Sequence, residues 1–394
     1  MTTVVPPVVA HLGEDFLAQV YGRAYRHFPG EPGRFGGLLD WSDLNTLLTH
    51  HRLEPPRLRL SVDGEALPQH AYTVPVTTRR NTVWQQLKPA ELHRHLAEGA
   101  TLVLDAVDEL HPGIGRLAQA LERHLHTGIQ VNAYASWTPK EGFGVHWDDH
   151  DVLVLQIDGA KRWRIYGPTR QAPLHRDTDV PEPPPNEPII ELVLNAGDML
   201  YLPRGWWHAV AASEGVHSLH LTCGMQTATG ADLLRWLSED LRRELCVRSD
   251  LPRFGTEEEK ADLMRSLRDL VMKEFGDSDL LDRFFAVRDA TERARLVPSL
   301  PYVEGIPPDP SLTVRLVTAR ALIGSDEEGN TVLTAGGEEW TVSAQARPLL
   351  TRLLDGERHR LDSLAEDAGL RIGQAALLVS ELVDGNVAVV ERTG

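Results

Sequence analysis

The chain has 394 residues, of which 42% are hydrophobic, so it is long enough for two or three domains with sizeable cores. Its formal net charge of −17 at pH 7 disfavours a nucleic-acid partner, because such binding needs Lys and Arg to neutralise phosphates. A basic polypeptide partner is easier to accommodate. The two cysteines, Cys223 and Cys246, match no zinc or disulfide spacing, which favours the cytoplasm. No signal peptide or membrane-spanning run is predicted.

The first part of the chain, residues 12–72, mixes short helical and turn signals and is interpreted as a lead-in. Within it, Asp40 or Ser42 is expected to cap a helix that carries several leucines.

Short segments rich in Val, Ile, Leu and Trp follow between residues 74 and 224. They are TLVLDAV, IQVNAYASW, DVLVLQI, KRWRIYG, IIELVL, DMLYLP, HAVAAS and HSLHLTCG. Turn residues separate them at Asp158-Gly159, Gly167-Pro168 and Ala196-Gly197-Asp198, and a proline-rich loop lies at residues 180–188. Many short strands at close spacing predict a β-barrel or double-stranded sandwich rather than a parallel sheet.

Helical periodicity replaces the strand pattern after Gly224. Two apolar stripes are predicted, one of Leu233, Leu234, Leu237 and Leu241 and one of Leu263, Leu267, Leu270, Val271 and Met272. The proline-rich segment at residues 296–312 is interpreted as a linker.

The last part of the chain has the outline of a winged helix. We expect a strand at 314–323, a hairpin through 328–330, helices at 344–354, 361–368 and 372–382, and a closing strand at 386–391. The candidate recognition helix at 372–382 offers only Arg371 and Gln374 for DNA contacts, and acidic residues outnumber basic ones in this part. Direct DNA binding is therefore not expected, and a protein-interaction or scaffolding role is favoured.

Three residues predict a metal site. In GVHWDDHDVLVLQI, His146 and Asp148 are two residues apart at the start of an expected strand, so their side chains should point to the same face. His208 follows the expected strand DMLYLP and a tight turn, and a second barrel strand would return it to the same place. Two imidazoles and one carboxylate leave coordination positions open, as a non-haem Fe(II) centre requires, although Mn, Ni and Zn bind the same set. The strand should carry His150 away from this metal.

Lys161 stands in the next strand, in DGAKRWRIYG, and shares its face with Trp163 and Ile165. A lysine among bulky residues inside a barrel is unfavourable unless an anion pairs with it. A dicarboxylate that chelates the metal at one end needs such a cation at the other end. Lys161 is therefore predicted to bind a cosubstrate.

These motifs resemble those of the JmjC-containing, cupin-type oxygenases, and among them the ribosomal oxygenases. The resemblance covers most of the chain and implies that His146, Asp148 and His208 bind Fe(II) and that Lys161 grips 2-oxoglutarate. The family pattern N-x-Y falls on Asn132, which would orient the cosubstrate, and on Tyr134, which would line the substrate channel. The related enzymes often have a small hydroxyl residue near Gly224, and this departure leaves the target side chain open.

The resemblance implies a mixed α and β fold in three parts. Residues 1–225 hold the lead-in and a double-stranded β-helix, the JmjC or cupin barrel, with its core at about 95–225. Residues 226–300 form a helical region for homodimer formation, and residues 312–394 form the winged helix.

The predicted function is Fe(II)-, 2-oxoglutarate- and O₂-dependent hydroxylation of a protein side chain, a His or Arg of a ribosomal protein. Demethylation of a Lys or Arg methyl group fits the architecture less well. One alternative is a tailoring hydroxylase of a peptide natural product or of a modified tRNA base, although the acidic charge disfavours tRNA. An alternative of another class is a non-catalytic, metal-binding cupin that serves as an interaction module, but such a module has no need of Lys161.

Overall fold

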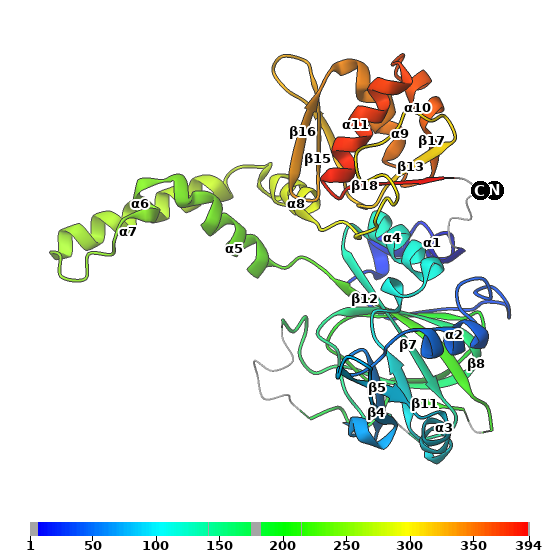
Figure 1. Ribbon diagram of the computed structural model, residues 1–394. Coiled ribbons are helices and arrows are strands. Elements are labelled where there is room, and N and C mark those ends of the chain that lie inside the picture. Colours follow the sequence, from blue (N-terminus) through cyan, green and yellow to red (C-terminus); the bar gives the residue numbers. More distant parts are fainter. Residues whose placement is uncertain (1–6, 141, 175–182, 214, 393–394) are drawn as a thin grey trace. The chain divides into compact units, whose positions relative to one another are not determined.

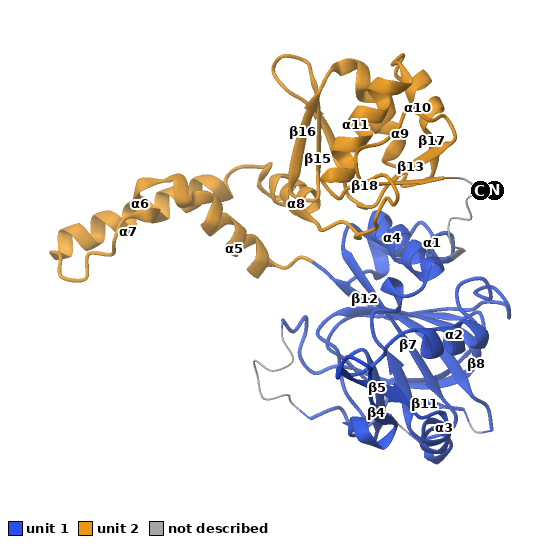
Figure 2. Cartoon of the chain, in the orientation of Figure 1, with its two compact units in different colours: residues 1–227 blue, residues 228–394 orange. Residues whose placement is uncertain are grey.

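The computed structural model describes residues 7–140, 142–174, 183–213 and 215–392, so part of the proline-rich loop at 180–188 lies outside the described residues. The chain divides into two compact units, Met1–Thr227 and Ala228–Gly394, which are coloured separately in Figure 2. The element labels below are those of Figure 1. No helix among the described residues is long and apolar enough to cross a membrane.

Unit 1 is built on an antiparallel sheet whose strand order is β1-β10-β8-β12-β7-β6-β2-β3, with β9 and β11 also pairing with β8. Its strands are β1 (Arg26–Phe28), β2 (Leu58–Val62), β3 (Glu65–Ala66), β6 (Thr101–Leu104), β7 (Gly128–Ser136), β8 (Asp151–Pro168), β9 (Ile190–Asn195), β10 (Met199–Leu202), β11 (Trp206–Ala212) and β12 (Ser218–Gln226). A separate hairpin joins β4 (Thr73–Thr77) and β5 (Val83–Leu87). The short strands and antiparallel pairing agree with the predicted barrel or sandwich class.

Strand β8 is the central strand of unit 1. Its first half pairs with β10 and β12, and its second half pairs with β9 and β11. The predicted turn at Asp158-Gly159 is wrong, because the strand continues through it to Pro168. Gly159 has φ +67°, and a Cβ there would lie 1.8 Å from the carbonyl oxygen of His217, so a glycine is needed where β8 passes from one set of partners to the other.

The side chains of the central strands alternate between two environments, as strand geometry requires. Leu153 and Leu155 belong to the large core, together with residues of the helices α1 and α4 and of strands β6, β7 and β12. Val154 and Trp163 belong to a second, smaller core inside the sheet, together with residues of β9 and β10. One face of these strands therefore meets the helices, and the other face encloses the interior where the predicted site residues lie.

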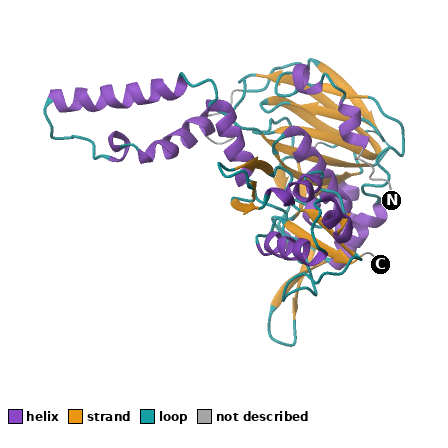
Figure 3. Cartoon of the chain, turned by 90° about the horizontal axis from the view of Figure 1, so that it is seen from above, coloured by secondary structure: helices purple, strands orange, loops and turns teal. Residues whose placement is uncertain are grey.

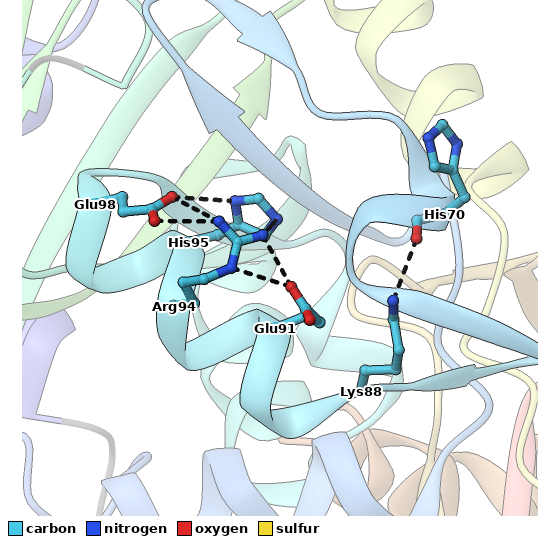
Figure 4. A network of polar contacts seen from close by, with 6 residues as sticks. All are labelled: His70, Lys88, Glu91, Arg94, His95 and Glu98. Atoms are coloured by element: carbon cyan, nitrogen blue, oxygen red, sulfur yellow. Dashed lines mark hydrogen bonds and ion pairs between the residues drawn. The ribbon is translucent and has the colours of Figure 1, made fainter.

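The described residues of unit 1 form the α-helices α1 (Pro7–Leu12), α2 (Trp41–His50), α3 (Pro89–Glu98) and α4 (Pro112–Leu125). The predicted cap of α2 is confirmed at Asp40, whose side chain accepts a hydrogen bond from the backbone N–H of Asp43 in a capping box. On α3, Arg94 pairs with Glu91 and Glu98, one turn away on either side (Figure 4). These exposed pairs support the helix modestly.

The first segment of unit 2 contains the helices α5 (Gly230–Asp240), α6 (Leu245–Arg248), α7 (Glu257–Phe275) and α8 (Leu280–Thr291), with no strand between them (Figure 3). Leu237 and Leu241 of the first predicted stripe are buried, whereas Leu234 is 57% exposed. Helix α7 buries no residue, and Met272 of the second stripe is 64% exposed. The periodicity is correct, but much of the apolar surface stays uncovered within unit 2.

The rest of unit 2 has its own core. Its elements are β13 (Leu312–Leu316), β14 (Leu322–Ser325), β15 (Thr331–Ala335), β16 (Glu338–Val342), α9 (Arg347–Leu353), β17 (His359–Arg360), α10 (Leu361–Asp367), α11 (Ile372–Asp384) and β18 (Ala388–Arg392). The prediction of one strand at 314–323 is wrong, because β13 pairs with β17 and β18 whereas β14 pairs with β15. The chain has to leave the first sheet to begin the second.

Candidate metal centre

The side chains of His146, Asp148 and His208 form one cluster, in which one potential ligand atom from each residue lies within 4.8 Å of the others. Nε2 of His208 is 3.6 Å from Oδ2 of Asp148, and the centroids of the two imidazoles are 4.3 Å apart. His208 is 3% exposed, whereas the other two residues are partly buried, so His208 is the most deeply buried of the three.

The backbone reaches this arrangement differently from the prediction. Strand β8 begins only at Asp151, so His146 and Asp148 precede it and their convergence does not come from strand alternation. Instead, His146 forms an isolated antiparallel bridge with His208. The backbone N–H of His146 donates to the carbonyl oxygen of His208 (N···O 3.0 Å), and the backbone N–H of His208 donates to the carbonyl oxygen of His146 (N···O 2.8 Å). The backbone N–H of Gly205 also donates to the carbonyl of Asp148. Pairing with the start of β11 therefore positions both ligands.

Each imidazole is oriented by a backbone carbonyl. Nδ1 of His146 lies 3.1 Å from the carbonyl oxygen of Gly144, and Nδ1 of His208 lies 2.9 Å from that of Trp206. A carbonyl oxygen only accepts, so each Nδ1 carries the hydrogen and each Nε2 keeps its lone pair for a metal. Such outer hydrogen bonds are the usual way in which ligating histidines are fixed. The donor set, two neutral imidazoles and a carboxylate, fits a divalent first-row metal ion.

Aromatic rings pack around the cluster. The ring of Trp163 in β8 stacks on that of His208, with the centroids 5.5 Å apart and the planes at 26°. The rings of Phe143 and His146 are in contact, with their centroids 5.9 Å apart. Trp147, between the two predicted ligands in sequence, contacts Trp207 at 6.5 Å. These rings hold the imidazoles rigidly and limit the access of water to the cluster.

Lys161 projects into the same interior from β8 and is only 3% exposed. Its Nζ donates a hydrogen bond of 2.6 Å to Oγ of Ser136 on β7. Burial lowers the pKa of Lys161 to about 7, because an ammonium far from water is destabilised relative to the neutral amine. An anionic ligand beside it would restore the charged form.

Asn132 and Tyr134 lie on β7, two residues apart, so their side chains point to the same face of the strand. Oδ1 of Asn132 accepts from the backbone N–H of Ala106, which holds the amide in place. Burial, and next the nearby carboxylate of Asp148, raise the pKa of Tyr134 to about 12. The phenol is therefore neutral and lies close enough to Asp148 to interact with it electrostatically.

Two further residues share this interior. Ser136 follows the Asn132–Tyr134 pattern by one more alternation, and that spacing is the signal by which the sequence indicates it. His220, on the neighbouring β12, stacks on Tyr134 with ring centroids 4.9 Å apart and an angle of 5° between the ring planes.

His150 lies in the loop before β8 and not in the expected strand. Its ring lies against Gly224, where a Cβ would come within 2.9 Å of its Cδ2.

The fold and this cluster define a class of protein: an antiparallel barrel with two histidines and one aspartate converging in its interior, as in cupin-type metalloproteins. The model of the JmjC domain matches residues 109–233, which include all three. Residues 109–233 are therefore similar to a JmjC domain, and the chain resembles the JmjC ribosomal oxygenases.

Curated relatives agree with this assignment. The chain is 30% identical to Ribosomal oxygenase 1 of Gallus gallus over 213 residues, 53% of this chain and 34% of the relative. It is 28% identical to Bifunctional lysine-specific demethylase and histidyl-hydroxylase NO66 of Drosophila persimilis over 238 residues, 56% of this chain and 32% of the relative. The chain thus spans about a third of the length of these two relatives.

Solved structures of YcfD, a ribosomal oxygenase from Escherichia coli, share the fold. The structure in complex with cobalt and succinic acid is 19% identical, has a TM-score of 0.58, and is matched over 96% of this chain and 97% of that chain. The structure in complex with cobalt and 2-oxoglutarate has a TM-score of 0.56 at 19% identity, over 93% and 96% of the two chains. The resemblance noted from the sequence is thereby confirmed at the level of fold.

Proposed function

We propose that this protein is an Fe(II)- and 2-oxoglutarate-dependent oxygenase that hydroxylates a His or Arg side chain of a ribosomal protein. The observation that carries the proposal is the pairing of two features in one barrel interior. His146, Asp148 and His208 converge with Nδ1 of each imidazole turned to a backbone carbonyl, and Lys161 is buried in the same interior. A metal-chelating dicarboxylate requires both features.

The three ligands would hold Fe(II) at one face and leave coordination positions for 2-oxoglutarate and O₂. Bound there, iron supplies the oxidative decarboxylation of 2-oxoglutarate that is coupled to oxidation of a substrate C–H bond. The chain's own residues bind, orient and shield the reactants. Lys161 would pair with the far carboxylate, Asn132 would orient the cosubstrate, and Tyr134 would line the channel through which the substrate side chain enters.

A ribosomal protein is the favoured substrate class for two reasons. The names of the relatives given above include ribosomal oxygenase and histidyl-hydroxylase, and the E. coli structures are titled ribosomal oxygenase. The net charge of −17 also suits a basic polypeptide, because electrostatic attraction raises the rate of encounter. We propose the cytoplasm as the site of this reaction, in agreement with the scarcity of cysteine.

The test is anaerobic reconstitution with Fe(II) and 2-oxoglutarate, followed by O₂, with succinate release measured with and without total ribosomal protein. We expect succinate release that rises with ribosomal protein and is lost in His146→Ala, with a mass increase of one oxygen on one ribosomal protein. Succinate release that ignores ribosomal protein would contradict the substrate, and a wild-type protein that binds no 2-oxoglutarate would contradict the oxygenase itself.

The helical segment at 226–300 is proposed to form a homodimer. Its exposed apolar side chains support this proposal, with Met264 63%, Met272 64% and Phe254 95% exposed. Surface of this kind is usually covered by another chain. Light scattering should give twice the monomer mass for the wild type and the monomer mass for the double variant Met264→Glu, Met272→Glu. A monomeric wild type at micromolar concentration would contradict the proposal.

The elements from β13 to β18 are proposed to form a winged helix that binds protein rather than DNA. Helices α9, α10 and α11 with the three-stranded sheet β17-β13-β18 support the winged-helix interpretation. The excess of acidic residues disfavours contact with phosphates. A gel-shift assay with duplex DNA at low salt should show no complex, and a salt-sensitive complex would contradict the proposal.

A further inference from the structure

His220 is a buried histidine that the proposed function does not yet use. It lies on β12, opposite Tyr134 on β7 and Gln156 on β8, and is 4% exposed. Its side chain contacts Tyr134 and Trp163, so it faces the barrel interior rather than the helices.

The hydrogen bond between Lys161 and Ser136 crosses this same strand. Lys161 belongs to β8 and Ser136 to β7, and β12 lies between these two strands in the sheet. Ser218 of β12 pairs with Ser136 on one side and with Gly159 on the other. The ammonium therefore lies over β12 close to the level of Ser218, and His220 is the next residue of β12 that faces the interior.

The ring of His220 also contacts two residues that lie next to the metal cluster. It stacks on the ring of Tyr134 with the centroids 4.9 Å apart. It meets the ring of Trp163 edge-on, with the centroids 6.4 Å apart and the planes at 74°. Trp163 in turn stacks on His208, and Tyr134 is close enough to Asp148 for the carboxylate to influence its pKa. The ring thus lies among the side chains that connect the Lys161 ammonium with the metal ligands.

Nδ1 of His220 is buried and has no hydrogen-bond partner within the described part of the chain. A buried polar atom without a partner is destabilising, and such atoms often mark a ligand site. Burial, and next the nearby ammonium of Lys161, hold the pKa of His220 well below its ordinary value. The imidazole is therefore neutral, with one N–H to donate and one nitrogen to accept.

We propose that His220 is a second cosubstrate-binding residue, which donates a hydrogen bond to the same far carboxylate of 2-oxoglutarate that pairs with Lys161. The proposal rests on the function proposed above. Oγ of Ser136 accepts from Lys161, so its own hydroxyl hydrogen is available as a third donor. A carboxylate has enough lone pairs to accept from all three groups. This arrangement explains why a histidine without a partner is placed beside a buried ammonium.

The first test compares two 2-oxo acids on the Mn(II)-loaded protein, with binding followed by the relaxation of water protons near Mn(II). 2-Oxoglutarate has the far carboxylate, and 2-oxobutyrate lacks it. His220→Phe keeps a ring on Tyr134 but removes the hydrogen-bond donor. It should lower the affinity for 2-oxoglutarate by about tenfold or more, as loss of a hydrogen bond to a charged group predicts. Binding of 2-oxobutyrate should change less than twofold.

The matched control is His217→Phe, the same substitution at a 45% exposed side chain that pairs with Asp158. It should leave both affinities unchanged. Equal weakening of the two acids in His220→Phe, or no weakening, would overturn the assignment of His220 while the oxygenase proposal stands. A wild type that binds Mn(II) but neither acid would instead overturn the proposed function.

A second measurement does not depend on the variant's folding. In the wild type loaded with Zn(II), the ring nitrogens of His220 should shift in ¹⁵N NMR when 2-oxoglutarate is added and remain unchanged with 2-oxobutyrate. His220→Asn, which retains an N–H donor, should restore part of the affinity lost in His220→Phe. Ring nitrogens that do not respond to 2-oxoglutarate would contradict the hydrogen bond directly.

Discussion

Lys161 donates a hydrogen bond of 2.6 Å to Ser136 across strand β12, in a part of unit 1 where both side chains are almost completely buried. Burial lowers the pKa of this lysine to about 7. A buried ammonium is unfavourable for folding and favourable for binding an anion. The position of Lys161 therefore indicates a binding role, and several measurable consequences follow from this site.

Replacement of the lysine by an apolar side chain should separate stability from binding. Lys161→Met should raise the free energy of unfolding by about 2 kcal/mol, because the desolvated amine is removed from the interior. The same variant should lose 2-oxoglutarate binding by at least about a hundredfold. Chemical denaturation and titration calorimetry measure the two effects. Lys140→Met, at an exposed lysine, is the control and should change neither quantity by much.

Binding of 2-oxoglutarate should weaken as the pH rises above about 7. The pKa of Lys161 is about 7 in the free protein, and a bound carboxylate favours the protonated amine, so binding takes up a proton above that pH. The dissociation constant should then increase towards about tenfold per pH unit between pH 7.5 and 9. Lys161→Arg keeps its charge at every pH tested and should flatten the profile. A flat wild-type profile would show that Lys161 is already charged when free.

Metal binding should depend on His146 and not on its neighbour His150. His146→Ala removes one of the three converging ligands and should lower the affinity for Mn(II) by about a hundredfold or more. Electron paramagnetic resonance or equilibrium dialysis measures this affinity. His150 belongs to the same loop but hydrogen-bonds to Asp149, so His150→Ala is the matched control. Comparable loss in both variants would mean that His150 ligates the metal as well.

The contact between His150 and Gly224 should appear as coupling between two substitutions. A Cβ at residue 224 would lie 2.9 Å from Cδ2 of His150, so Gly224→Ser should lower stability by about 1 kcal/mol. The double variant Gly224→Ser, His150→Ala should recover most of this loss, because the ring that must move is gone. Additive effects in thermal unfolding would contradict the contact.

Patterns among neighbouring residues in the sequence predict many of the strands and helices correctly. Short segments rich in Val, Ile, Leu and Trp indicated the strands of unit 1, and the residues around Asp40 indicated the helix cap, because both signals depend on neighbours in sequence. The continuity of β8 through Gly159 was missed, since a glycine with positive φ is a turn signal until both sides of the strand are seen to be paired. The split between β13 and β14 was missed for a related reason, because sheet membership is decided by distant partners.

The sequence by itself determined which chemical groups are available. The spacing of His146, Asp148, His208 and Lys161 indicated a metal with a dicarboxylate, because few other ligands need that combination. Only the tertiary structure decided how these groups meet. The bridge between His146 and His208 replaces the expected strand alternation, and the sheet order places Ser136, Lys161 and His220 on three adjacent strands. Pairing between strands far apart in sequence sets these distances, and no local pattern encodes it.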